Sequence, residues 1–296
     1  MVAPDPQPLD ALIIGGGVAG LVCAHRLKQL GRNIMLVESQ AHVGGTLNSE
    51  RVGEYLIEWG AHTSSRSSEL ELLIDELGLR AQFAATPPAV RNRFLVRPDA
   101  QNLLRLQAVP LSLREAVGTP LLSLRAKAKV VAEAFQRQID EKDCTVAQFI
   151  ERRFGNEFLQ TLIAPALNGV WAGDVERMSA KHSLPRLWEA QRHGGSVLRG
   201  MLLKPRSKTK PPRGIFSFRS GMKTLPFALA NELGATVLLS TRVDSIAQEA
   251  SPGRGIAVQL TTPTGPKQIE ARYVIIATSA EAVSYTHLTL PTSDLV

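Results

Sequence analysis

The fold is decided by residues 10–38, DALIIGGGVAGLVCAHRLKQLGRNIMLVE. Ala11 to Ile14 is a short apolar run that suits a strand buried on both faces of a parallel sheet. The pattern Gly15-x-Gly17-x-x-Gly20 follows at once and is typical of a turn that holds a pyrophosphate against the start of a helix. An apolar residue then recurs about every three positions, and Gly31 is expected to cap this helix in a left-handed conformation. The stretch predicts a strand, turn and helix that bind a nucleotide.

A second apolar strand, Ile34 to Val37, ends at Glu38. An acid at this distance beyond the glycines binds a ribose hydroxyl in dinucleotide folds. A glycine-rich loop without a ligand is the alternative, but the strand, the periodic helix and the acid together favour a nucleotide site. The residues expected to contact the nucleotide here are Gly15, Gly16, Gly17, Val18, Ala19, Gly20, Glu38 and Ser39.

Length and composition are those of an ordinary globular protein, with 296 residues, 44% of them hydrophobic and 21% charged. No apolar run is long enough to span a bilayer, and the N-terminus lacks a secretory pattern, so we expect a cytoplasmic protein. Cys23 and Cys144 lie far apart and the histidines show no ligand spacing, so neither a disulfide framework nor a metal site is predicted. The formal charge of +7 favours an anionic small molecule or lipid surface. Nucleic acid is not expected, because aromatic residues make up only 5% and no basic stretch interleaves with them.

Two segments after Glu38 resemble a large group of flavin enzymes, the amine oxidases, desaturases and porphyrinogen oxidases. The flexible turn Gly44-Gly45 is one, and the segment Glu58-Trp59-Gly60-Ala61-His62 is similar to that group's Glu-x-Gly motif. The resemblance implies FAD, rather than a nicotinamide, as the cofactor. It adds expected cofactor contacts at Gly44, Gly45, Thr46, Gly60, Ala61, His62 and Thr63.

Several unlinked motifs then follow in an order that resembles the FAD-dependent protoporphyrinogen oxidases: Gly169 to Asp174, Met178-Ser179, Pro185 to Trp188, Gly195 to Val197 and Phe216 to Pro226. The resemblance covers residues 10 to about 283. It implies the oxidation of protoporphyrinogen IX to protoporphyrin IX, in haem biosynthesis, with dioxygen as the electron acceptor. Because the flavin carries the chemistry, no catalytic side chain is expected.

The same resemblance assigns roles to individual residues. Arg93 matches the arginine that pairs with a substrate propionate, and Arg97 is expected to assist; a surface arginine is the alternative. Val243 matches a backbone contact to the FAD adenine, although an ordinary strand valine fits as well. His62 stands where the animal enzyme has an arginine. The expected wall facing the porphyrin is Gly169, Ala172 and Gly173.

Three alternatives stay open. Coproporphyrinogen III, which carries more carboxylates, is a second candidate substrate. An amine oxidase or carotenoid desaturase shares the first 80 residues of the pattern but not the GVWAGD and SGMKTLP motifs. The family pattern stops after Val283, in SYTHLTLPTSDLV, so a C-terminally truncated, inactive fragment is the third.

The patterns together predict an α/β protein, with a discontinuous Rossmann-like FAD-binding domain and an inserted, mainly helical domain that faces substrate or membrane. The expected ranges are 1–90 and 214–283 for the FAD-binding domain, 91–213 for the insertion and 284–296 for an atypical tail. Helices are expected over 70–79 and 122–137 and after the cap Thr145, a strand over 236–243, and a hairpin of 256–261 with 268–276.

Association with other surfaces is a separate expectation. The leucine- and arginine-rich helices of the insertion and the basic loop 204–213 fit a peripheral contact with an anionic bilayer. An ordinary core and a solvated linker fit the same residues. A homodimer is also expected.

Overall fold

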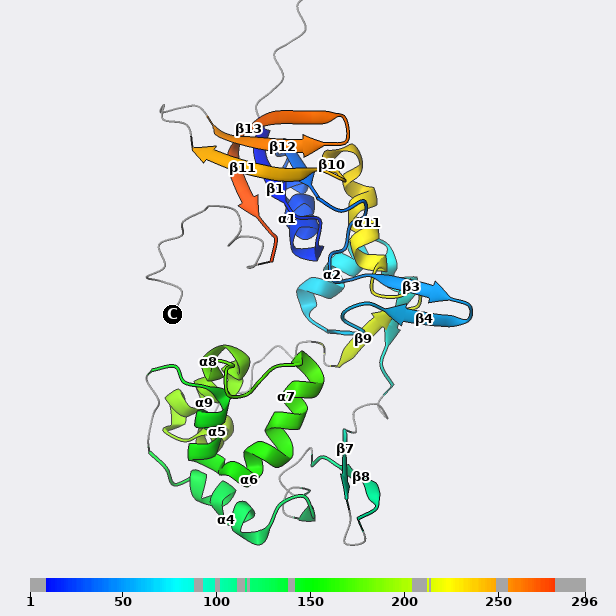
Figure 1. Ribbon diagram of the computed structural model, residues 1–296. Helices are drawn as coiled ribbons and strands as arrows, with labels where there is room; N and C mark the ends of the chain where they lie inside the picture. The colour runs from blue at the N-terminus through cyan, green and yellow to red at the C-terminus, as the bar shows by residue number, and fades with distance from the viewer. Residues whose placement is uncertain are drawn as a thin grey trace, which may run out of the picture. The chain divides into compact units, whose positions relative to one another are not determined.

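The computed structural model describes residues 9–87, 93–98, 102–110, 115, 118–137, 142–203, 212, 214–248 and 255–279. The chain divides into two compact units (Figure 1). One unit is formed by residues 1–86 and 211–296, and the other by residues 87–210. The nucleotide-binding pattern therefore belongs to a unit whose two parts are far apart in the sequence.

A six-stranded sheet in the order β10-β2-β1-β13-β12-β11 forms the first unit. The central strand β1 runs parallel to β2 on one side and to the end of β13 on the other. The other part of the sheet, β11 to β13, is an antiparallel meander. The strands are β1 (Leu9–Ile14), β2 (Ile34–Val37), β10 (Val237–Leu238), β11 (Arg242–Gln248), β12 (Ile256–Thr262) and β13 (Gly265–Ile276).

Both faces of β1 are buried, as its unbroken apolar sequence predicted. Alternate residues point to opposite faces of a strand, so Ala11 and Ile13 join one hydrophobic cluster while Leu12 and Ile14 join another. The first cluster includes the helices α1 (Val18–Gln29) and α11 (Thr224–Leu233), which lie side by side in Figure 1. The second cluster includes Val258, Leu260 and Ile269 of the meander.

Smaller elements complete the first unit. The strands β3 and β4 form a hairpin, and β5, β9 and β6 form a three-stranded sheet in that order. The predicted helix over 70–79 is α2, which begins after the cap Ser67 and ends before Gly78, a residue in the left-handed conformation. The bounds are β3 (Ser49–Val52), β4 (Tyr55–Glu58), β5 (Ser64–Ser65), α2 (Ser68–Glu76), η1 (Leu79–Gln82), β6 (Phe83–Ala85), β9 (Ile215–Phe218) and η4 (Gly234–Thr236).

The expectation of one strand over 236–243 is wrong. The strand β10 ends at Leu238 and β11 begins at Arg242, with Ser240 between them at a φ of 49°. The amides of Ser240 and Thr241 donate to the carbonyl oxygens of Gln40 and Glu38, at 2.9 and 2.8 Å. The break exists because this loop bonds to the end of β2, a tertiary contact that the local apolar pattern does not reveal.

The second unit consists of a hairpin and a group of helices. Thr145 caps α5 as predicted, through a capping box with Gln148. The helix expected over 122–137 is the shorter α4, and of its neighbouring apolar residues Leu121 and Leu122 are buried while Leu124 is 83% exposed. The bounds are β7 (Phe94–Pro98), β8 (Leu104–Ala108), α4 (Leu124–Glu133), α5 (Val146–Phe154), α6 (Asn156–Phe158), the π-helical η3 (Leu159–Ile163), α7 (Ala164–Trp171), α8 (Ala180–Ser183), α9 (Pro185–Gly194) and α10 (Val197–Leu203).

A buried ion pair lies among these helices. Arg153 of α5, 2% exposed, donates from Nη1 to Oε1 of the fully buried Glu133 of α4, at 3.0 Å. Glu133 also accepts the hydroxyl of Ser196 and the amides of Val197 and Leu198, which are the first N–H groups of α10. The second guanidinium nitrogen of Arg153 bonds to Gln191 of α9. The ion pair and its hydrogen bonds therefore connect α4, α5, α9 and the start of α10.

Candidate functional site

The turn at Gly15 to Gly20 has the geometry of an anion-binding helix start. Gly17, with φ −69° and ψ 171°, is the N-cap residue of α1. It has no side chain to cap the first N–H groups, and the first turn of α1 contains no acidic residue. The first N–H groups of a helix lack intrahelical partners and attract negative charge. Gly20 packs directly on the turn, since a Cβ there would lie 2.0 Å from the carbonyl oxygen of Gly15.

Glu38 is held firmly at the end of β2. Its Oε2 accepts the amide of Gly16 at 2.6 Å, and its Oε1 accepts the amide of Gln40 at 2.8 Å and the hydroxyl of Ser39 at 3.1 Å. These bonds fix the carboxylate beside the glycine turn, because β1 and β2 are adjacent and parallel and their carboxyl ends share one edge of the sheet. The geometry suits an acceptor for ribose hydroxyls.

A cavity of about 170 Å³ opens at this edge. Four of its lining residues, Gly15, Glu38, Ser39 and Val243, were predicted as cofactor contacts. Most of the residues at and beside β11 and at the end of β13 were not predicted. Because sites for drug-sized ligands usually measure about 300 to 1,000 Å³, this cavity suits one part of a dinucleotide. Its lining consists of Ile14, Gly15, Val37, Glu38, Ser39, Thr241, Arg242, Val243, Ile246, Ile276 and Thr278.

The missed residues carry a weak sequence signal. Ile276 and Thr278 end the segment YVIIAT, and a strand parallel to β1 must bring its carboxyl end to the same edge. Thr241 and Arg242 had no such signal, because the strand expected over 236–243 hid the break before β11.

The second glycine turn runs beside the first. Gly44 forms a parallel bridge with Gly17, and its amide donates to the carbonyl oxygen of Gly16 at 2.8 Å. A Cβ on Gly45 would lie 3.4 Å from the Cα of Gly17, and one on Gly60 would lie 2.0 Å from the carbonyl oxygen of Thr46. The predicted Gly44–Thr46 and Gly60 segments are therefore contiguous with the nucleotide turn. Ala61, His62 and Thr63 follow as an exposed segment between β4 and β5.

Glu58, the acid of the Glu-x-Gly segment, has a structural contact. Its Oε1 accepts the amide of Met222 at 2.9 Å, and its Oε2 accepts the hydroxyl of Ser49 at 2.7 Å. Gly221 has a φ of 91°, and a Cβ there would lie 2.4 Å from the Ser49 hydroxyl oxygen. The Glu-x-Gly and SGM motifs, far apart in the sequence, thus form one clamp between the β3–β4 hairpin and the turn before α11.

The predicted substrate residues all belong to the second unit. Arg93 precedes β7 and is exposed, and Arg97 on β7 is exposed with Nη1 donating to the carbonyl oxygen of Leu121 at 3.5 Å. Ala172 ends α7 in the left-handed conformation, at φ 49°. Gly169 is exposed on α7, and a Cβ there would meet no atom within 4 Å.

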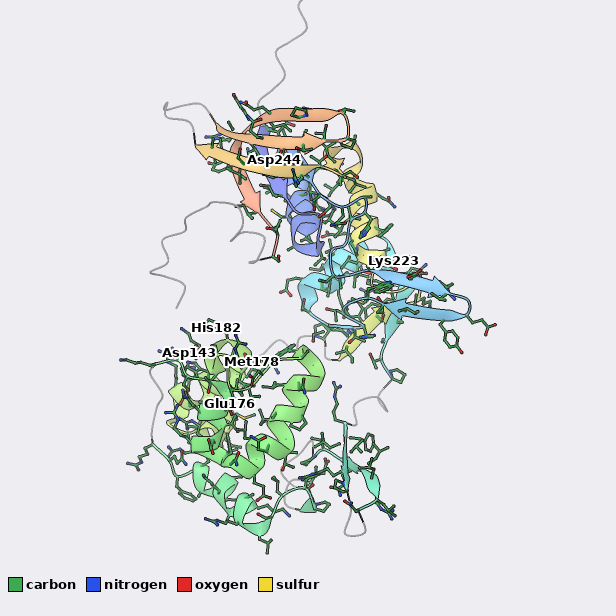
Figure 2. The ribbon with its side chains drawn as sticks, in the orientation of Figure 1. Asp143, Glu176, Met178, His182, Lys223 and Asp244 are labelled. Carbon is green, nitrogen blue, oxygen red and sulfur yellow. The ribbon has the colours of Figure 1, made fainter. Side chains whose placement is uncertain are left out.

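Gly173 packs against the side chain of Met178. A Cβ at this position would lie 2.4 Å from the sulfur of Met178, which Figure 2 labels in this unit. The Met178 carbonyl accepts the amide of Val146, so the loop after α7 folds back onto α5. A side chain at position 173 would therefore require the Met178 side chain to move.

Residues 18–295 match the family model described as flavin containing amine oxidoreductase. The chain belongs to this family. A mitochondrial protoporphyrinogen oxidase from Nicotiana tabacum is 32% identical over 253 residues, which cover 78% of this chain and 49% of that relative. Coproporphyrinogen III oxidase from Staphylococcus aureus is 27% identical over 255 residues, 79% of this chain and 54% of the relative. The chain spans about half the length of the curated relatives it matches.

Solved structures agree on the fold. A protein from Exiguobacterium sp., provisionally named protoporphyrinogen oxidase, superposes with a TM-score of 0.69 at 24% identity, over 94% of this chain and 61% of that one. Putrescine oxidase gives a TM-score of 0.63 at 17% identity, over 95% and 60%. These likenesses confirm the predicted α/β FAD-binding fold, and the relatives confirm the predicted resemblance. FAD is the cofactor of the flavin amine oxidoreductase family, as predicted.

The described residues fit the ADP half of FAD. The glycine turn leaves open space where a Cβ of Gly17 would stand, at the first N–H groups of α1. The carboxylate of Glu38 and the apolar walls from Val37, Val243 and Ile246 line the adjoining cavity. A pyrophosphate at the turn and an adenosine in the cavity therefore match the chemistry present at each place.

Two further findings concern only the described part of the chain. There, no helix is long and apolar enough to cross a membrane. The same residues contain no group of three or more histidine, cysteine, aspartate or glutamate side chains arranged to hold a metal ion.

Proposed function

We propose that the chain carries the nucleotide-binding part of an FAD- and oxygen-dependent oxidase that converts protoporphyrinogen IX to protoporphyrin IX. The observation that carries the proposal is the cavity at the carboxyl ends of β1, β2 and β13, where Glu38 and two adjoining glycine turns fit the ADP half of FAD. The similarity to named protoporphyrinogen oxidases at up to 32% identity supports the substrate class.

The residues of this chain bind and orient in that reaction. The N–H groups at the start of α1 hold the pyrophosphate, and Glu38 accepts the ribose hydroxyls. When bound, FAD supplies the hydride acceptor that no side chain provides. The bonds of Glu58 hold the β3–β4 hairpin in place. This hairpin leads into the Gly60 to Thr63 segment, whose backbone is expected to contact the flavin.

The second candidate substrate is coproporphyrinogen III, favoured by the similarity to the coproporphyrinogen III oxidases of Staphylococcus aureus and Bacillus subtilis. It differs in carrying more carboxylates, so it requires more cations in the substrate site. Product fluorescence measured with each porphyrinogen in turn distinguishes the two, and equal inertness of a full-length close homologue to both would remove the porphyrinogen assignment.

Flavin binding is the direct test of the nucleotide site. The purified chain, mixed with FAD and passed through a desalting column, should retain a yellow flavin absorbance band and quench the fluorescence of free FAD. Loss of all flavin on the column would contradict FAD binding by this polypeptide and favour the inactive alternative.

Arg93 is the proposed partner of a substrate propionate, with Arg97 beside it on the same hairpin. Arg93→Ala should weaken binding of a porphyrin with propionate groups by roughly 1 to 3 kcal/mol, the value of a charged hydrogen bond. Titration of porphyrin fluorescence measures this. Arg186→Ala, an exposed arginine on α9, is the matched control, and an equal loss in both variants would mean a general charge effect instead.

We also propose a peripheral contact with an anionic membrane, and a homodimer as the assembly state. Apolar residues support the membrane contact: Met201, Leu202 and Leu203 are exposed at the end of α10, and the basic sequence KPRSKTKPPR follows them. Co-sedimentation with anionic but not neutral phospholipid vesicles is expected. Sedimentation velocity at increasing protein concentration measures the assembly state.

A further inference from the structure

Helix α11 receives its N-terminal negative charge from another part of the chain. Its first turn, TLPF, contains no acidic residue. The positive end of a helix attracts an anion. Glu58, at the end of β4, supplies one, because its Oε1 accepts the amide of Met222, just before the helix, at 2.9 Å. A carboxylate of the β3–β4 hairpin therefore caps the start of α11.

Ser49 connects the same carboxylate to the next amide. Its hydroxyl, on a residue that is 2% exposed, donates to Oε2 of Glu58 at 2.7 Å and accepts the amide of Lys223 (labelled in Figure 2) at 3.0 Å. Ser49 and Glu58 lie directly opposite each other in the pairing of β3 with β4. One oxygen of the carboxylate thus bonds within the hairpin, and the other bonds to the start of the helix.

Helix α11 also packs on the second glycine turn. A Cβ on Gly44 would lie 3.4 Å from Cγ of Pro226, which is buried in the first turn of α11. The amide of Gly44 donates to the carbonyl oxygen of Gly16, in the nucleotide turn. The amide of Leu47 donates to the carbonyl oxygen of Gly44 at 2.9 Å. The start of α11 therefore contacts the segment before β3 as well as the hairpin.

These two contacts hold neighbouring segments. The amide of Trp59 donates to the carbonyl oxygen of Asn48 at 2.9 Å, and Gly60 packs on the backbone of Thr46. Residues 44–48 and 58–60 therefore run beside each other, and α11 contacts both of them. The contact through Glu58 consists of directional hydrogen bonds, so it fixes the position of the Gly60 segment relative to the glycine turn.

We propose that Glu58 is a positioning residue that gives the nucleotide site its preference for FAD over ADP. Both ligands carry the pyrophosphate and adenosine assigned to the glycine turn and Glu38, whereas FAD alone carries a flavin. The Gly60 to Thr63 segment, where the flavin contact is expected, begins two residues after Glu58. A segment that is already held in place costs less to order on binding. The inference rests on the proposed function, and it extends the site to the start of α11.

Calorimetric titrations of the whole chain with FAD and with ADP test the inference. Glu58→Ala should weaken FAD binding by roughly tenfold or more, about the value of a charged hydrogen bond, and leave ADP binding unchanged. Because both ligands carry the same pyrophosphate, the ratio of their affinities cancels a long-range effect of the lost charge. Glu58→Gln keeps an acceptor for the Met222 amide and should restore part of the FAD affinity.

Two further variants make the comparison specific. Ser49→Ala removes the hydroxyl between Glu58 and Lys223, so it should also weaken FAD binding selectively, by less than Glu58→Ala. Glu54→Gln removes an exposed acid from the turn of the same hairpin and should change neither affinity. The thermal unfolding midpoint of each variant shows that it is folded. Should Glu58→Ala not fold, Glu58→Gln and Ser49→Ala give the same comparison.

The ratio of the two affinities decides the result. Equal losses for FAD and ADP in the Glu58 variants would overturn the inference, because the carboxylate would then support the fold as a whole. Unchanged FAD affinity would overturn it too. So would an unmodified chain that binds FAD no more tightly than ADP, because no flavin contact would exist for Glu58 to position. Binding of neither nucleotide by the unmodified chain would contradict the proposed function, and the inference with it.

Discussion

Gly17→Ala should fold normally and bind ADP roughly ten- to a hundredfold more weakly. Gly17 has a φ of −69°, which alanine adopts without strain, and its Cβ would meet no protein atom within 4 Å. That open space is the proposed place of a pyrophosphate at the N–H groups of α1, so the methyl group should displace the pyrophosphate and remove about one charged hydrogen bond. Calorimetric titration with ADP gives the affinity, and thermal unfolding shows that stability is retained.

Gly20→Ala is the matched control three residues away. Its Cβ would lie 2.0 Å from the carbonyl oxygen of Gly15, so the helix must move from the turn, at a cost of about 1 to 3 kcal/mol or more in stability. Gly17→Ala should therefore lower the affinity for ADP, whereas Gly20→Ala should lower the stability of the fold. Full ADP affinity in Gly17→Ala would show that the glycine turn does not carry the pyrophosphate.

Arg153→Met should destabilise the second unit by about 3 to 5 kcal/mol. The substitution leaves the carboxylate of Glu133 fully buried without its positive partner, and an uncompensated buried charge is among the costliest changes in a protein. The side chain of Trp188, 3% exposed and packed on Phe149, provides the signal for urea unfolding. Trp59 and Trp171 are replaced by phenylalanine in every variant, so that only Trp188 reports.

Two companion variants make the result specific. Arg152→Met removes the adjacent, exposed arginine of α5 and should cost below about 1 kcal/mol. Glu133→Gln combined with Arg153→Met removes both charges and should recover much of the lost stability, because well-matched neutral groups often replace a buried pair at little cost. Equal losses in Arg152→Met and Arg153→Met would contradict a special role for the buried pair.

The sequence predicted the local half of the proposed nucleotide site. Gly15, Gly17 and Glu38 lie within one strand, turn, helix and strand, where spacing alone determines the geometry. The opposite wall comes from β11 and β13, and its position depends on strand order. Thr241 and Arg242 were missed because their strand begins where a tertiary contact with the Glu38 segment breaks an apolar run.

The resemblance of the motifs identified the family but did not show whether each motif has a structural or a ligand-binding role. Glu58 begins the segment in which Gly60 to Thr63 were expected to contact the cofactor, and its own carboxylate bonds to Met222 and Ser49. Gly173 was expected against a porphyrin, and it also packs against the side chain of Met178. A sequence pattern does not distinguish a residue that packs against the protein from one that contacts a ligand. The packing in the structure identifies the first kind. The substrate roles of Arg93, Arg97, Gly169, Ala172 and Gly173 stay predictions.

The double pairing of β13 has a consequence for the order of folding. Its first residues pair with β12 and its last, Tyr273 to Ile276, pair with β1, so one strand joins the meander to the N-terminal strand of the chain. During synthesis on a ribosome, β1 emerges early. Its second partner strand, β13, and the cavity can form only after the residues up to about 278 have been made. Contacts so distant in sequence form slowly. We expect nascent chains that end before β13 to expose β1 as an unpaired edge and to depend on chaperones until synthesis passes that point.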